Sequence, residues 1–161
     1  ARLWDLSGNQ IVEFTGHQDR VWSISFSPDG QSIATASDDG TARLWDLSGN
    51  QIVEFTGHQD WVWSVSFSPD GQSIATASAD RTARLWDLSG NQIVEFTGHQ
   101  DRVWSVSFSP DGQSIATASA DRTARLWQVR TLDELLAQGW AWLGDYLASH
   151  PEARGRLEVR G

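Results

Sequence analysis

Residues Ala42 to Thr82 read ARLWDLSGNQIVEFTGHQDWVWSVSFSPDGQSIATASADRT, which is one copy of a repeat of 41 residues. The copy at Ala1–Thr41 differs from it at four positions, and the copy at Ala83–Thr123 differs at one. A fourth copy starts at Ala124 and departs from the repeat after Trp127. A period of about 40 residues is typical of solenoids, propellers and arrays. Because one repeat cannot bury both of its faces alone, each copy needs neighbours.

The composition of the chain narrows the possible partners. The net charge is −9, and an acidic surface repels nucleic acid and anionic membranes, so we expect neither as a partner. The absence of cysteine excludes disulfides and thiolate chemistry. No apolar run approaches the ~20 residues that span a bilayer, and no signal peptide is visible. The chain does not begin with Met, so we expect a segment of something longer or a processed chain. We expect the protein to be located in the cytoplasm.

Each repeat predicts four short strands separated by turns. The first full set comprises Val21–Phe26, Ser32–Ser37, Thr41–Leu47 and Gln51–Thr56. Ser-Pro-Asp-Gly, Asp-Asp-Gly and Ser-Gly-Asn between them are turn signals. Strict alternation in VWSISF would place Trp, Ile and Phe on one face of the strand, opposite Val and two Ser. Short strands at even spacing favour an all-β ring or barrel.

The recurring elements Gly-His, Val-x-Ser-Val-x-Phe-Ser-Pro-Asp-Gly, Ser-x-Asp-x-Thr and Leu-Trp-Asp resemble the WD-repeat β-propeller family over residues 1 to about 129. The near-identical copies are similar to recently amplified bacterial arrays, those of cyanobacteria especially, or to an engineered array. The resemblance implies blades of four strands, a to d from the ring axis outward. It also implies a non-enzymatic protein-interaction scaffold that needs no cofactor.

Counting strands predicts an incomplete ring. Residues 1–15 supply strands c and d, residues 21–56 and 62–97 supply two full blades, and residues 103–129 supply a, b and c. These 13 strands make three blades with one strand to spare, whereas rings typically need four to eight blades. Three blades alone would expose two apolar faces and open edges. We therefore expect identical chains to associate head to tail into a closed ring.

The chain ends predict how the seam between copies forms. Strand d at Gln10–Thr15, with Ile11, Val12 and Phe14, can complete the last blade of another copy by β-augmentation. One strand c is then in excess, and we expect displacement of Arg2–Leu6 in preference to Arg125–Val129.

Two ring sizes are arithmetically possible. A dimer would have six blades, within the usual range, and a trimer nine, outside it. Trp22, Trp63 and Trp104 on strand a would crowd a narrow ring, which favours the homotrimer, with the dimer as the runner-up.

The remaining residues, 130–161, predict a helical extension and a basic tail. Thr131 and Glu134 form a capping box, apolar residues follow at helical spacing, and Pro151 ends the helix.

A buried hydrogen-bond network is implied by the family resemblance. It joins a His, an Asp and a Trp with either a Thr or a Ser in each blade. The sets are His17, Asp39, Trp45 with Thr35 or Ser37; His58, Asp80, Trp86 with Thr76 or Ser78; and His99, Asp121, Trp127 with Thr117 or Ser119. Ser, His and Asp in each repeat could also suggest a hydrolase, but a nucleophilic triad needs an oxyanion hole and an exposed Ser, and the sequence indicates neither. A metal site is disfavoured because His17, His58 and His99 would each lie in a different blade, whereas the ligands of one zinc ion must lie close together.

Differences between the copies predict a binding rim. Apart from the Ile24/Val65 exchange, they fall in the loop before strand a or in the b–c turn, which share one rim. The candidate residues are Arg20, Trp61, Arg102, Asp38, Arg81 and Arg122. This rim would bind a protein or peptide, and the competing explanation is drift at tolerant loop positions. The alternative function is a fragment or engineered chain whose sole activity is ring assembly; a hydrolase or metal enzyme is a third.

Overall fold

The computed structural model describes residues 1–129, 146, 148 and 149 of the chain. Residues 146, 148 and 149 are helical, whereas the rest of the predicted helical extension and the basic tail lie outside the described residues. The chain divides into two units between Gln128 and Val129, and the first is described here by itself. Within the part of the chain that the structure describes, no helix combines the length and apolar composition needed to cross a membrane.

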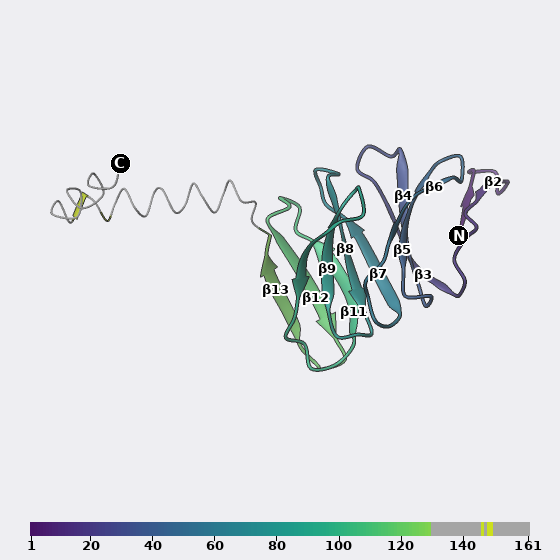
Figure 1. Ribbon diagram of the computed structural model, residues 1–161. Helices are drawn as coiled ribbons and strands as arrows, with labels where there is room; N and C mark the ends of the chain where they lie inside the picture. Colours follow the sequence, from purple (N-terminus) through teal and green to yellow (C-terminus); the bar gives the residue numbers. More distant parts are fainter. Residues whose placement is uncertain (130–145, 147, 150–161) are drawn as a thin grey trace, which may run out of the picture. The chain divides into compact units, whose positions relative to one another are not determined.

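Residues 1–129 contain thirteen short strands in four antiparallel sheets, which confirms the all-β prediction (Figure 1). A two-stranded sheet pairs β1 (Arg2–Trp4) with β2 (Gln10–Glu13). Blade 1 has the order β3 (Val21–Phe26), β4 (Ser32–Ser37), β5 (Ala42–Asp46), β6 (Gln51–Phe55). Blade 2 has the order β7 (Val62–Phe67), β8 (Ser73–Ser78), β9 (Ala83–Asp87), β10 (Gln92–Phe96). Blade 3 has the order β11 (Val103–Phe108), β12 (Ser114–Ser119), β13 (Ala124–Gln128). No ring closes within the described residues.

An aspartate side chain closes the turn between the third and fourth strands of a blade. Asp46 Oδ1 accepts the backbone N–H of Ser48 at 2.8 Å and of Asn50 at 2.9 Å. The side-chain amide of Asn50 donates to Oδ2 at 2.8 Å. After β13 the equivalent position is Gln128, and Val129 follows in place of Leu. The sequence that makes this turn is therefore missing after β13, and blade 3 has three strands among the described residues.

The first strand of each blade carries a β-bulge, so the predicted strict alternation is wrong at its beginning. The register shifts between Val62 and Ser64 in β7, and at the equivalent places in β3 and β11. Val62 therefore joins Val65 and Phe67 in one buried cluster instead of facing away from them. A bulge inserts an extra residue and redirects its side chain, and here that residue is Trp63.

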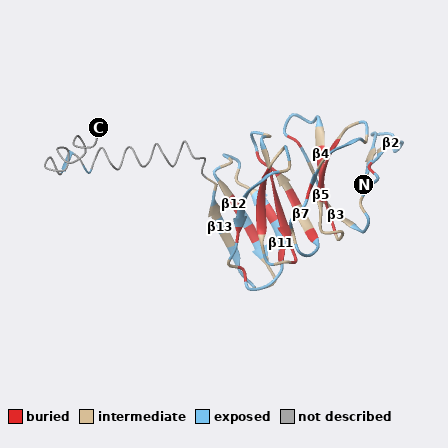
Figure 2. Ribbon diagram, in the orientation of Figure 1, coloured by how far each residue is buried: buried red, intermediate tan, exposed pale blue. Residues whose placement is uncertain are grey.

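Blades 1 and 2 pack face to face, and the small residues of β4 permit the close approach. Ala34 and Ala36 are fully buried in a cluster with Val65 and Phe67 of β7. The Ser23 hydroxyl of β3 also accepts the backbone N–H of Val65 at 3.3 Å. Figure 2 shows the buried residues concentrated in these two blades.

The outer faces of the first and last blades expose residues whose equivalents are core. Phe26 of blade 1 is 52% exposed, whereas Phe67, one repeat later, is 7% exposed. At the other end, Leu126 of blade 3 is 68% exposed, whereas Leu44 of blade 1 is 4% exposed. The two ends therefore present the two halves of an inter-blade contact.

Candidate functional site

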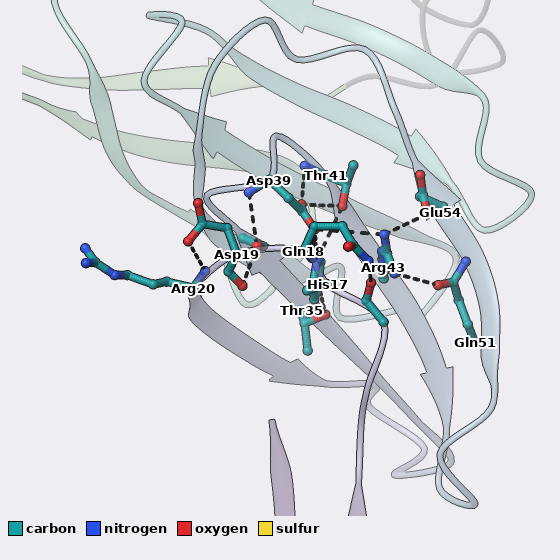
Figure 3. Close-up of polar contacts among 12 residues, drawn as sticks. His17, Gln18, Asp19, Arg20, Thr35, Asp39, Thr41, Arg43, Gln51 and Glu54 are labelled. Carbon is teal, nitrogen blue, oxygen red and sulfur yellow. Dashed lines mark hydrogen bonds and ion pairs between the residues drawn. The ribbon is translucent and has the colours of Figure 1, made fainter.

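A chain of hydrogen bonds ties the side chains of Trp45, Thr35, His17 and Asp39 together in blade 1. Figure 3 shows Thr35, His17 and Asp39 of this chain. Trp45 Nε1 lies 2.8 Å from Thr35 Oγ1, which lies 2.7 Å from His17 Nε2. His17 Nδ1 lies 2.8 Å from Asp39 Oδ2. The indole can only donate, so the Thr35 hydroxyl is free to donate to His17 Nε2. The Nδ1–H of a neutral His17 then donates to Asp39.

The same chain recurs in the next two blades. In blade 2, His58 lies 2.8 Å from both Asp80 and Thr76, and Trp86 donates to Thr76 at 2.8 Å. In blade 3 the distances are 2.7 Å for His99–Asp121, 2.8 Å for His99–Thr117 and 2.9 Å for Trp127–Thr117. In every set the hydroxyl comes from Thr, whereas the sequence left Thr or Ser open. The register explains this, because Thr35 pairs with Arg43 on β5 and Ser37 ends β4 at the turn.

Ser37, two residues after Thr35 in β4, makes different contacts. The Ser37 hydroxyl donates to the Asp19 carbonyl at 3.3 Å and accepts the N–H of Asp39 at 3.1 Å. Both contacts fix the turn that carries Asp39. The Thr35 hydroxyl is fully buried. A substrate carbonyl therefore has no route to the hydroxyl beside His17.

The environment holds the first network in one charge state. Burial alone would raise the pKa of Asp39, but hydrogen bonds from Thr41, the Gln18 backbone and His17 outweigh it and lower the pKa to about 2. Burial lowers the pKa of His17, and the hydrogen bond to Asp39 offsets part of this effect. Asp39 is thus ionised and His17 neutral at pH 7. Among the described residues, no group of three His, Asp or Glu side chains lies close enough to bind a metal ion.

A groove of about 660 Å³ opens on the rim formed by the loops before β3, β7 and β11 and the turn after β4. Four of the six candidate rim residues line it, namely Arg20, Asp38, Trp61 and Arg102. Arg81 and Arg122 do not. They occupy the left-handed backbone region with φ of 73° and 69°, where the first copy has Gly40.

Three tryptophans that the sequence assigned to the ring interior also line this groove: Trp22, Trp63 and Trp104. Trp63 and Trp104 stack with ring centroids 4.2 Å apart and planes 9° apart. The ring of Trp61 lies 6.0 Å from that of Trp63 at 51°. Alternation alone missed this placement because the bulge redirects the second residue of the strand. The excess of aromatic residues at that position was the available signal.

The seam residues lie in and just after β2, which ends at Glu13, two residues before the predicted end. Ile11 is exposed and Phe14 is buried. The ring of Phe14 lies 6.0 Å from that of Trp45. The equivalent Phe55–Trp86 pair, at 5.9 Å, joins blade 1 to blade 2. The β1–β2 sheet therefore packs on blade 1 as the outer half of a preceding blade.

Comparison with known proteins gives one family and several partial relatives. The profile described as "WD domain, G-beta repeat" matches residues 8–46, 49–87 and 90–128. Coronin-7 of Homo sapiens is 48% identical over 40 residues, which cover 24% of this chain and 4% of that protein. The guanine nucleotide-binding protein subunit beta of Zea mays is 45% identical over 42 residues, 25% of this chain and 11% of that protein. The match thus spans a small fraction of the length of either curated relative.

Proposed function

The chain belongs to the WD domain, G-beta repeat family, and from this premise we propose that it is a non-enzymatic protein-interaction scaffold, a β-propeller assembled from copies of itself. Repeats of this family point to protein binding in general. The finer proposal is that identical chains associate head to tail. The observation that carries it is the exposure of matching half-interfaces at the two ends of the described blades.

The two exposed faces are complementary because the repeat supplies both within one chain. Val65 and Phe67 of blade 2 pack on the alanines and Leu44 of blade 1. Their equivalents Ile24 and Phe26 are about half exposed on blade 1, and the equivalent of Leu44 is the exposed Leu126. Docking blade 3 of one copy on blade 1 of another would reproduce a contact that the fold already makes.

A cation–π pair gives a second match between the ends. The guanidinium carbon of Arg102 lies 5.9 Å from the centre of the Trp63 ring in the preceding blade. The same relation, one interface further, would place Arg20 over Trp104 of a second copy. Both residues line the exposed rim groove. Such a pair stabilises by about 0.5–2 kcal/mol, depending on how far it is desolvated.

The proposed seam uses β13 and displaces β1. Trp127 of β13 already donates to Thr117 at 2.9 Å and completes the network of blade 3. Trp4, its equivalent in β1, is half exposed. We infer that β2, with Ile11, Val12 and Phe14, completes blade 3 of another copy and that β1 is the strand given up.

The histidine networks are proposed to be architectural. Each one links the loop before a blade to its second and third strands, and all three have the same geometry. Buried polar groups joined in this way stabilise the blade when complete and destabilise it when one member is lost.

The mass of the assembly in solution tests the ring. Three copies of the 17.8 kDa chain give about 53 kDa and nine blades, which we propose, and two copies give about 36 kDa and six blades. Light scattering on a sizing column separates these masses. Leu126→Asp provides the matched variant, because it places a charge on the docking face without touching a network. If the chain of residues 1–161 stays monomeric at micromolar concentration, the proposal is contradicted.

A further inference from the structure

The junction between blades 2 and 3 contains an arginine–tryptophan pair that the junction between blades 1 and 2 lacks. Arg102 precedes β11 and its guanidinium lies over Trp63, the bulged residue of the blade before. One repeat earlier, the position of Arg102 holds Trp61 and the position of Trp63 holds Trp22. Trp22 therefore lacks the arginine that its equivalent has, and its side chain is 55% exposed.

A second difference falls at the same junction between blades 1 and 2. Asp38 stands where the other copies have Ala79 and Ala120. Its Oδ1 accepts the indole N–H of Trp63 at 3.2 Å, which brings a carboxylate to the wall of the groove. Relative to the other copies, this junction has lost a cation and gained an anion.

From this pairing we propose that the rim groove binds the guanidinium of an arginine side chain in a basic segment of a partner protein. Trp22 and Trp61 line the groove and are 55% and 46% exposed, and Asp38 and Asp19 supply carboxylates to the same lining. A guanidinium is planar, stacks on aromatic faces and pairs with carboxylates through two parallel hydrogen bonds. The net charge of −9 adds a long-range attraction for basic segments.

Arg20 and Arg102 also line the groove, but among the described residues neither forms an ion pair with Asp19 or Asp38. The Arg102 guanidinium lies over Trp63. Arg20 lies in the loop before blade 1, one repeat before Trp61, and the assembly proposed above would place it over Trp104 of a second copy. The inference rests on the proposed role of this rim as the binding face, but the three residues of the proposed slot, Trp22, Trp61 and Asp38, all line the groove within one chain.

The test uses N-acetylarginine amide as the probe and N-acetylcitrulline amide as its neutral isostere. Titration is followed by NMR of the indole N–H groups, with the Trp63 signal assigned by its shift in Asp38→Ala. We expect saturable shifts with the arginine probe and none with citrulline. Asp38→Ala lowers the affinity about tenfold, the size of a lost charged hydrogen bond. Trp61→Arg has a stronger effect and abolishes binding, because the new arginine lies over Trp22 as Arg102 lies over Trp63.

Both variants install residues that the other copies carry at the same position, so the fold should tolerate them. A gain-of-function variant completes the test. Ala79→Asp combined with Arg102→Trp reproduces the slot at the junction of blades 2 and 3. The stoichiometry of probe binding should then rise from one to two per chain.

Equal binding of citrulline, or arginine binding that neither single variant weakens, would overturn the inference. Saturation by a neutral sugar such as methyl glucoside without arginine binding would also overturn it. Measuring the mass of the same samples separates the two proposals. An assembled ring without arginine binding refutes the slot alone, and arginine binding by a stable monomer refutes the ring alone.

Discussion

Replacing Thr76 with Val tests the hydrogen-bond network of blade 2 with almost no change of shape. The Thr76 hydroxyl is fully buried, accepts the indole N–H of Trp86 at 2.8 Å and lies 2.8 Å from His58 Nε2. Without it, one buried donor and one buried acceptor lose their partner. Each unsatisfied group costs about 1–3 kcal/mol, so we expect the free energy of unfolding to fall by about 2–6 kcal/mol.

Urea denaturation followed by tryptophan fluorescence measures this loss. All variants are compared at one chain concentration, because association makes the apparent stability depend on concentration. Thr56→Val is the matched control, since it makes the same chemical change at an exposed position after β6 and should shift stability by no more than about 0.5 kcal/mol. If the two variants lose equal stability, the network contributes nothing and the reasoning fails.

Three further outcomes follow from the structure. Leu126→Asp should leave a monomer on light scattering, because docking would bury about two thirds of this leucine, worth about 1–2 kcal/mol per interface, and a buried charge reverses that gain. Arg81→Gly should raise the free energy of unfolding by about 0.5–1 kcal/mol in urea, since it relieves a φ of 73° and restores the residue found at Gly40. The melting temperature should fall from pH 7 to pH 5, because the pKa of His17 is lowered on folding and the unfolded state binds protons that the folded state does not. A second fall in the melting temperature should follow between about pH 4 and pH 2, because Asp39, whose pKa is lowered to about 2, becomes protonated there.

The strand pattern was predictable because turn chemistry and repeat agree in every copy. The predicted ranges Val21–Phe26 and Ser32–Ser37 coincide with β3 and β4. The prediction for the fourth strand, Gln51–Thr56, ran one residue beyond β6. Turn residues and strand alternation involve residues that are adjacent in sequence, so a single sequence is enough to predict them.

The rim groove was only partly predictable, because a bulge depends on how two strands pair and not on either strand alone. The sequence marked Asp38 and Trp61 as departures from the repeat, but strict alternation kept Trp22 and Trp63 away from them. Likewise, the choice of Thr35 over Ser37 in the network depends on register across β4 and β5.

A near-perfect repeat carries little information about where it should stop, since every junction is nearly equivalent. The wedge angle between blades and the number of copies must then set the size of the ring, and a head-to-tail contact between chains can replace a contact within one. The positions that distinguish one junction from the next are the few that differ, and Asp38 and Trp61 meet at the same junction. In a trimer this junction would occur three times on one rim. Three weak arginine slots on one rigid ring would bind a partner with several basic segments far more tightly than any single slot, because each later contact forms at high effective concentration.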